Sequence, residues 1–189
     1  MTGRVPLASP EQALAVGRAI GAPDAMTTRN AFRTLANNPV MAEGVFTQLT
    51  TLLNRNSFPT RLRELAIMRI GWATGSEYEW TQHWRVATGA GVPPEDTLAV
   101  RDWRASDRLG AADRAVLAAT DEMLATGRIG DAAWAECHRH VPGAAEQVEM
   151  VVCIANWIMF SMLLRTLEIP VEDGVMAWPP DGRRPDDGA

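Results

Sequence analysis

Residues 75–84, GSEYEWTQHW, bring together side chains that can transfer protons. Glu79 lies four positions before His83, so on a helix the two side chains share one face. A carboxylate beside an imidazole fixes its tautomer and raises its basicity, which suits a histidine to general acid–base catalysis. The alternative is an ordinary surface ion pair, which stabilises a helix by about 0.2–0.5 kcal/mol.

Three aromatic residues, Tyr78, Trp80 and Trp84, lie on the same segment. A helix that carries them is seldom mostly exposed, so the Glu79–His83 pair is expected to be partly buried. The three aromatic side chains are candidates for walling an apolar substrate pocket. The alternative for the tryptophans is an ordinary place in the core or in a subunit interface.

A second carboxylate, Glu64, lies in the apolar segment RLRELAIMRI, residues 61–70. Burial there would raise its pKa and suit it to proton transfer. Alternatively, Glu64 stabilises a helix N-terminus or pairs with a neighbouring arginine. Arg69 and Arg85 are candidates for holding a substrate carboxylate.

The elements that must position these side chains are helices. Residues 60–74 are apolar on more than one side, which predicts a central helix that ends at Gly75. Ser76 then stands where a helix cap is expected, before a helix that closes at Gly89. Ser9 and Pro10 start an earlier helix as cap and first helical residue. No strand or hairpin signal competes, so the sequence predicts an all-α protein.

The length of 189 residues fits one globular domain, expected over residues 1–169. Residues 170–189 are rich in proline, glycine and aspartate and are expected to be extended or partly disordered. The apolar run at 150–164 is short and contains Asn156 and Ser161, which disfavours a membrane span. With no signal-peptide pattern at the N-terminus, we expect a cytoplasmic protein.

Composition excludes several kinds of chemistry. The net charge is −5 and no basic cluster occurs, which disfavours nucleic acid and anionic membranes as partners. The sequence contains no lysine, which excludes a lysine Schiff base and covalently attached pyridoxal phosphate. Cys137 and Cys153 form no disulfide or zinc-ribbon pattern, and residues 137–140, CHRH, lack further ligands for a metal site. We therefore expect neither a metal nor another cofactor.

The segment from about residue 38 to 100, and above all RLRELAIMRIGWATGSEYEWTQHWRVATGAGVPPED, resembles the carboxymuconolactone decarboxylase / alkyl hydroperoxidase D family. The later ADRAVLAATDEMLATGRIGDAAW is similar to the second half of that family. The resemblance implies an orthogonal bundle of six to eight helices. It also implies an obligate homo-oligomer, a trimer or a hexamer.

Motif positions carried over from the family distinguish between its branches. The peroxidase branch's glutamate falls on Glu64, its two cysteines on Ser76 and Glu79, and its histidine on His83. A peroxidatic disulfide cycle needs two thiols, and neither Ser76 nor Glu79 supplies one. The decarboxylase branch lacks the thiol pair and keeps a glutamate four residues before the histidine, as this sequence does.

The resulting expectation is a cofactor-free acid–base enzyme that acts on a small organic acid, lactone or enolisable carbonyl compound. His83 would transfer the proton, Glu79 would orient it, and Glu64 would be the second acid–base group. Two alternatives stay open at this point: a peroxidase-like oxidoreductase, disfavoured because the thiols are absent, and a non-catalytic binding or scaffold protein.

Overall fold

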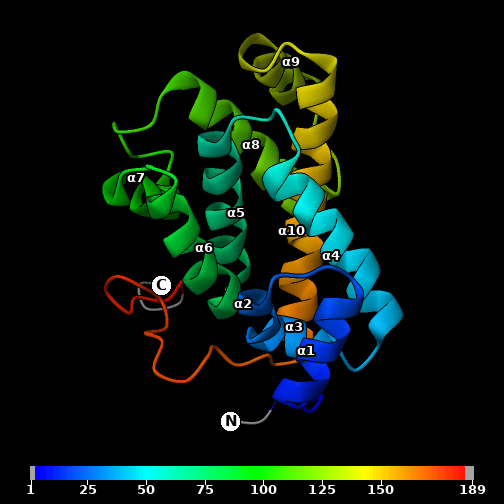
Figure 1. Ribbon diagram of the computed structural model, residues 1–189. Helices are drawn as coiled ribbons and strands as arrows, with labels where there is room; N and C mark the ends of the chain where they lie inside the picture. Colours follow the sequence, from blue (N-terminus) through cyan, green and yellow to red (C-terminus); the bar gives the residue numbers. More distant parts are fainter. Residues whose placement is uncertain (1–2, 186–189) are drawn as a thin grey trace. The chain divides into compact units, whose positions relative to one another are not determined.

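The computed structural model describes residues 3–185, and all regular structure within them is helical (Figure 1). The prediction of an all-α protein is confirmed. The helices are more numerous than expected because three of them, α2, α3 and α7, have only four to six residues. In chain order the elements are α1 (Pro10–Ala19), α2 (Asp24–Thr27), α3 (Asn30–Leu35), α4 (Pro39–Asn54), α5 (Thr60–Thr74), α6 (Glu77–Gly89), α7 (Pro94–Ala99), the 3₁₀-helix η1 (Val100–Asp102), α8 (Ala111–Thr126), α9 (Asp131–His140) and α10 (Ala144–Thr166).

The chain divides into two compact units, and each is built from two separate stretches of sequence. The first unit comprises residues 3–56 and 163–175, and the second comprises residues 57–162 and 176–185. The single domain over residues 1–169 stays a prediction. All the candidate site residues belong to the second unit.

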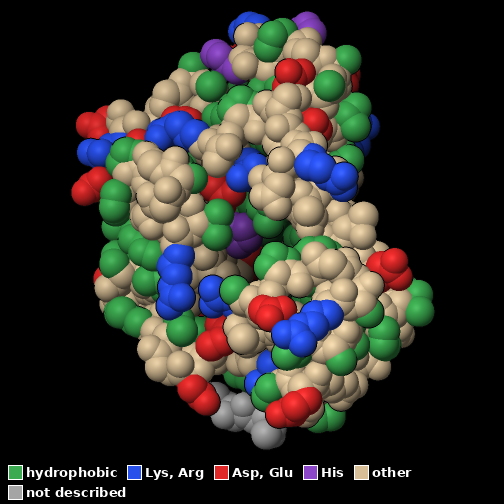
Figure 2. All heavy atoms as spheres, in the orientation of Figure 1, with side chains coloured by type: hydrophobic (Ala, Val, Ile, Leu, Met, Phe, Trp, Pro, Cys, Tyr) green, Lys and Arg blue, Asp and Glu red, His purple; other side chains and the backbone are tan. Residues whose placement is uncertain are grey.

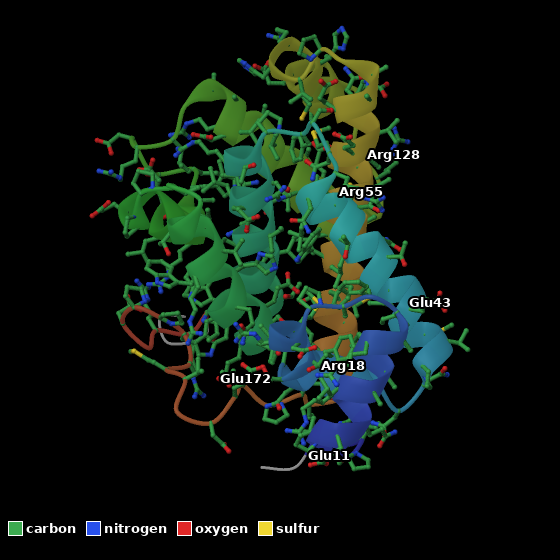
Figure 3. The ribbon with its side chains drawn as sticks, in the orientation of Figure 1. Glu11, Arg18, Glu43, Arg55, Arg128 and Glu172 are labelled. Atoms are coloured by element: carbon green, nitrogen blue, oxygen red, sulfur yellow. The ribbon has the colours of Figure 1, made fainter. Side chains whose placement is uncertain are left out.

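The first unit has its own small core, made mainly by α1, α3 and α4. Ser9 accepts a hydrogen bond from the Gln12 backbone N–H at 3.1 Å, and Pro10 is the first residue of α1, as the sequence predicts. Glu43 points away from α4 into solvent (Figure 3). The later stretch of the unit is held by Asn30, whose backbone N–H donates to Glu172 at 2.9 Å.

Helix α5 is the central element of the second unit, and it packs against both α6 and α8 (Figure 1). Its residues are buried on every side, as its apolar pattern predicts. Gly75 ends α5 in the left-handed conformation at φ 67°, where a glycine meets no steric penalty. Gly71 permits a close approach of α6, because a Cβ atom there would lie only 3.1 Å from the Trp80 backbone nitrogen.

The core of the second unit is rich in tryptophan. Trp80 lies 5.3 Å from Trp72 and 6.4 Å from Trp84, measured between ring centroids. Trp178, from the stretch after α10, is buried against the rings of Trp72 and Trp80 at 6.0 Å from each. The Arg101 guanidinium carbon lies over the Trp72 and Trp80 rings at 4.7 and 4.9 Å. Residues 170–185 thus form no helix or strand but contribute a side chain to the core.

Helix α10 is long and apolar enough to cross a membrane by length and composition, and within residues 3–185 no other helix is. Two of its polar side chains, Asn156 and Ser161, are buried, and Ser161 shares a hydrogen bond with Thr74 of α5. That α10 does not span a membrane stays a prediction. On the face drawn in Figure 2, arginine and acidic side chains are interspersed, with no extended patch of one sign.

Candidate functional site

Glu64 is the most deeply buried charged group of the site, with an exposed fraction of 0%. It lies in the second turn of α5, next to Arg63, whose side chain is also buried. The Arg63 Nε–H donates to Oε1 of Glu64 at 2.9 Å. The other carboxylate oxygen, Oε2, lies 2.9 Å from Nδ1 of His83 on α6. Each oxygen of the Glu64 carboxylate therefore faces one nitrogen group.

Opposing effects set the ionisation of Glu64. Burial on its own would raise the pKa of this carboxyl group. The hydrogen bonds from His83 and Arg63, together with the charge of Arg63, outweigh that effect and hold the Glu64 pKa below its ordinary value. Glu64 is therefore a carboxylate at neutral pH. Of the interpretations open from sequence, the pairing with a neighbouring arginine is the one that the structure contains.

His83 is bound through both of its ring nitrogens. The Trp157 indole N–H, from α10, donates to Nε2 at 2.9 Å, and the two rings meet edge to face at 85°. Because Nε2 accepts a hydrogen bond there, the ring proton must reside on Nδ1, from which it is donated to Glu64. The arrangement thus holds the imidazole in a single tautomer.

Glu79 is buried at 2% exposure, and neither of its carboxyl oxygens has a hydrogen-bond partner within residues 3–185. The expected hydrogen bond from Glu79 to His83 is therefore not made. Helical spacing places the two residues on one face, but Glu64 and Trp157 already occupy both nitrogens of the imidazole. Burial raises the pKa of Glu79 well above its ordinary value, so this carboxyl group is held in the neutral form.

Ser76 occupies the N-cap position of α6, but its side chain makes no capping hydrogen bond. Its hydroxyl oxygen is buried and has no hydrogen-bond partner in the part of the chain that the structure describes. The expectation of a side-chain cap is wrong: Ser76 stands at the N-cap position, but its hydroxyl group makes no hydrogen bond to the first turn of α6. Ser76 and Glu79 thus place two unpartnered polar side chains near the start of α6.

The two arginines considered for substrate binding make no hydrogen bond or ion pair with Glu64, Glu79 or His83. Arg69 donates to the Asp121 carboxylate at 2.7 and 3.3 Å and to the backbone oxygens of Val100 and Arg101. Arg85 is exposed on α6. The structure does not bring either one into contact with His83, and their binding role stays a prediction.

The three aromatic candidates for a substrate pocket lie in the core of the second unit or at its edge. Tyr78 and Trp80 are buried, and the Trp80 indole N–H donates to the Pro179 backbone oxygen at 2.8 Å. Trp84 is partly buried and stacks on Trp80. These contacts belong to the tryptophan-rich core, which is the alternative that the sequence left open. That the three side chains also wall a substrate pocket stays a prediction.

Cys153 lies on α10 close enough to Glu64 and Glu79 for both carboxyl groups to affect it electrostatically. Burial raises the pKa of its thiol, and both carboxyl groups add to that shift. Cys137 is buried elsewhere, where its thiol donates to the Ala115 backbone oxygen, and burial raises its pKa to about 11. Both cysteines are free thiols. Within residues 3–185, no cluster of three or more His, Cys, Asp or Glu side chains is placed to hold a metal ion.

Sequence reasoning missed one member of the site, Trp157. Arg63 is one of the three arginines, with Arg61 and Arg69, that the sequence offers as partners of Glu64, and it is the one that makes the pair. Trp157 lies 74 positions after His83, inside an apolar run where a tryptophan is ordinary. Its one distinguishing feature is an indole N–H, which needs an acceptor when buried.

The middle of the chain matches the model of a known family. Residues 41–122 match the model of the carboxymuconolactone decarboxylase family. The matched residues begin in α4, end in α8 and include Glu64 and His83. No curated protein is significantly similar to the sequence. The resemblance to the carboxymuconolactone decarboxylase and AhpD-like proteins is confirmed.

Solved structures share the fold. An uncharacterised peroxidase-related protein from Ralstonia eutropha with an alkylhydroperoxidase AhpD core superposes with a TM-score of 0.74 at 16% identity, covering 92% of this chain and 94% of that one. A putative antioxidant defence protein AhpD from Agrobacterium tumefaciens gives 0.66 at 19% identity, covering 73% and 96%. The debrominase Bmp8, in complex with 2,3,4-tribromopyrrole, gives 0.67 at 19% identity, covering 86% and 85%.

Proposed function

From the match to the carboxymuconolactone decarboxylase family and the buried chain from Arg63 through Glu64 to His83, we propose that this protein is a cofactor-free acid–base enzyme. Its substrate is a small organic acid, a lactone or an enolisable carbonyl compound. The observation that carries the proposal is the hydrogen bond between the Glu64 carboxylate and Nδ1 of His83, because it prepares the opposite nitrogen to accept a proton.

His83 is the proposed base. Its Nε2 takes a proton from the carbon next to the substrate carbonyl group, so that the C–H bond breaks and the electron pair moves to form an enolate. The imidazolium ion that results keeps its Nδ1–H bond to Glu64, whose negative charge stabilises it. Arg63 keeps Glu64 ionised and limits its movement.

Glu79 is the proposed acid. Its carboxyl group carries a proton at neutral pH because of its burial, whereas Glu64 does not. The ionised Glu64 supports His83 as the base, and the neutral Glu79 serves as the acid, so the opposite pKa shifts of the two carboxyl groups suit them to different roles. Glu79 would donate to the enolate or to its oxygen, and the protonated His83 would restore it. Isomerisation uses both transfers. Decarboxylation, in which the C–C bond breaks, CO₂ leaves and the electron pair forms the enolate, uses the donation by Glu79, and lactone opening by elimination, in which the carboxylate leaves, uses the proton removal by His83.

The other parts of the proposal concern the cellular compartment, the oligomeric state and the cofactors of the enzyme. The protein would act in the cytoplasm as a trimer or hexamer, without metal or organic cofactor and without nucleic acid. The fold neighbours include peroxidase-related proteins, but the peroxidase alternative is disfavoured because both thiols are buried with raised pKa values.

Turnover of a panel of small lactones and enolisable acids tests the proposal. On any substrate found, His83→Gln should lower turnover by roughly 10²–10⁴-fold, the usual contribution of a positioned acid–base residue. Glu79→Gln should cost less, since water can replace a general acid in part. His138→Gln, on the exposed side of α9, is the matched control and should leave turnover unchanged.

Two results would contradict the proposal. In one, His83→Gln retains full turnover while remaining folded. In the other, His83→Gln loses its fold or oligomeric state while the folded fraction keeps its specific activity, which would make His83 a structural residue. Melting temperature and rate measured on the same samples separate these outcomes.

A further inference from the structure

Trp157 makes the contact in the site that the proposed function does not explain. Its side chain is buried, and its indole N–H donates to Nε2 of His83 at 2.9 Å. In the Nδ1–H tautomer, Nε2 carries the only lone pair in the plane of the imidazole ring. While the indole group is in place, that lone pair is occupied, and His83 has no free acceptor for a substrate proton.

The groups around His83 determine what could take the place of the indole N–H. From α5 come the Glu64 carboxylate and the Arg63 guanidinium, whose charges offset each other. From α6 comes the buried Glu79 carboxyl group, and from α10 comes the Cys153 thiol. An anion at Nε2 would meet a lone pair and lie close to the Glu64 carboxylate. A neutral hydrogen-bond donor meets neither obstacle.

We propose that Trp157 is a positioning residue that holds the site closed by donating its indole N–H to Nε2 of His83. The ligand that opens the site is a neutral hydroxyl compound, such as an enol or a phenol, whose O–H group replaces the indole N–H at Nε2. This rests on the proposed function in one respect, that Nε2 is the atom that faces the substrate. It adds that substrate is recognised as its neutral hydroxyl form and that binding requires movement of Trp157.

The closed state can be tested without turnover, by magnetic resonance of the full chain labelled with ¹⁵N. The Trp157 indole signal is identified by its loss in Trp157→Phe, and the exposed Trp134 indole serves as reference. We expect the Trp157 indole proton to resonate downfield of the Trp134 proton and to exchange more slowly with solvent. We also expect the ¹⁵N signal of Nε2 in His83 to move downfield in Trp157→Phe, because a hydrogen bond to that nitrogen is lost. A Trp157 proton that shifts and exchanges like that of Trp134 would overturn the proposal.

Phenol and its methyl ether, anisole, test the nature of the ligand, because they have similar size but only phenol donates a hydrogen bond. Phenol should bind and move the Trp157 indole signal toward the Trp134 position, and anisole should leave it in place. Trp157→Phe should bind phenol about 2- to 10-fold more tightly, the factor that one net hydrogen bond represents. Equal binding of both compounds, or weaker binding of phenol by Trp157→Phe, would contradict the proposed ligand class.

The two proposals can fail separately. If the resonances and the phenol response are as expected but no substrate is turned over, His83 is part of a binding site and the acid–base function fails. If turnover depends on His83 while Trp157→Phe changes neither the Nε2 resonance of His83 nor phenol binding, the enzyme proposal stands and the role of Trp157 fails.

Discussion

Arg63 and Glu64 are neighbours in the sequence and form an ion pair in which both side chains are buried. Adjacent residues on a helix normally point in different directions, so helical spacing alone does not predict this pair. Its burial makes the pair sensitive to the loss of one partner.

Glu64→Gln should lower the free energy of unfolding by about 3–5 kcal/mol at pH 7, because it removes the carboxylate charge that faces a buried guanidinium. Urea unfolding measures this. Asp24→Asn is the control: its pair with Arg18 is 64% and 66% exposed at the two side chains, and its loss should cost about 1 kcal/mol or less. Equal effects of the two substitutions would show that the buried pair contributes no more to the free energy of unfolding than the exposed pair does.

The stability contributed by Glu64 depends on pH with a definite sign. Its pKa is lower in the folded protein than the ordinary value of 4.5, so the contribution is fully present above that value. It is lost as the pH falls through the lower, folded value. The difference in unfolding free energy between the wild type and Glu64→Gln should therefore shrink on acidification below about pH 4.5.

Glu79 should show the opposite dependence. Burial raises its pKa, so between the ordinary value of 4.5 and the higher folded value the unfolded chain has released a proton that the folded protein retains. Wild-type stability should thus fall relative to that of Glu79→Gln as the pH rises above 4.5. Thermal unfolding of both proteins at pH 5 and pH 8 measures the change. A gap that stays constant would mean that Glu79 titrates as it does in water.

Trp178 should be as important to stability as a residue within a helix. Trp178→Ala should lower the unfolding free energy by about 3–5 kcal/mol, since the ring packs on Trp72 and Trp80 and its N–H donates to Glu77. Trp134→Ala, at 38% exposure on α9, should cost far less. Near-ultraviolet circular dichroism should lose the signal of coupled indoles in the first variant only.

Redox chemistry should be absent. Replacing Cys137 and Cys153 together with alanine should leave turnover largely intact, and neither protein should consume peroxide with a thiol reductant. The reason is the raised pKa of both thiols, which leaves very little thiolate at neutral pH. Loss of activity in a folded double variant would revive the oxidoreductase alternative.

The parts of the fold that could be predicted from sequence depend on local interactions. The start of α1 at Ser9 and Pro10 is one example, because the cap lies within three residues of its donor. The end of α5 at Gly75 is another, because the backbone there needs a left-handed residue. The meeting of Glu64 with His83 joins residues 19 positions apart, and the family resemblance rather than local pattern placed them together.

Contacts over longer separations could not be predicted. Helical spacing allowed Glu79 to reach His83, but it carried no information on which groups from α5 and α10 would compete for the ring. Trp157 lies in a helix where any apolar residue fits the pattern, so nothing in its sequence context indicated a polar contact. Trp178 follows a stretch rich in turn-forming residues, and the Trp72 and Trp80 rings against which it packs come together only in the folded unit.

The interleaving of the two units has a consequence for the growing polypeptide on the ribosome. The first unit needs Glu172, whose carboxylate binds the Asn30 backbone, and the second needs Pro179, which accepts from Trp80 99 positions earlier. Translation delivers both residues after every helix of both units has been made. The nascent chain therefore carries two unfinished cores with exposed indole rings until the stretch that contains Glu172 and Pro179 emerges. During that interval it should bind chaperones that hold apolar segments.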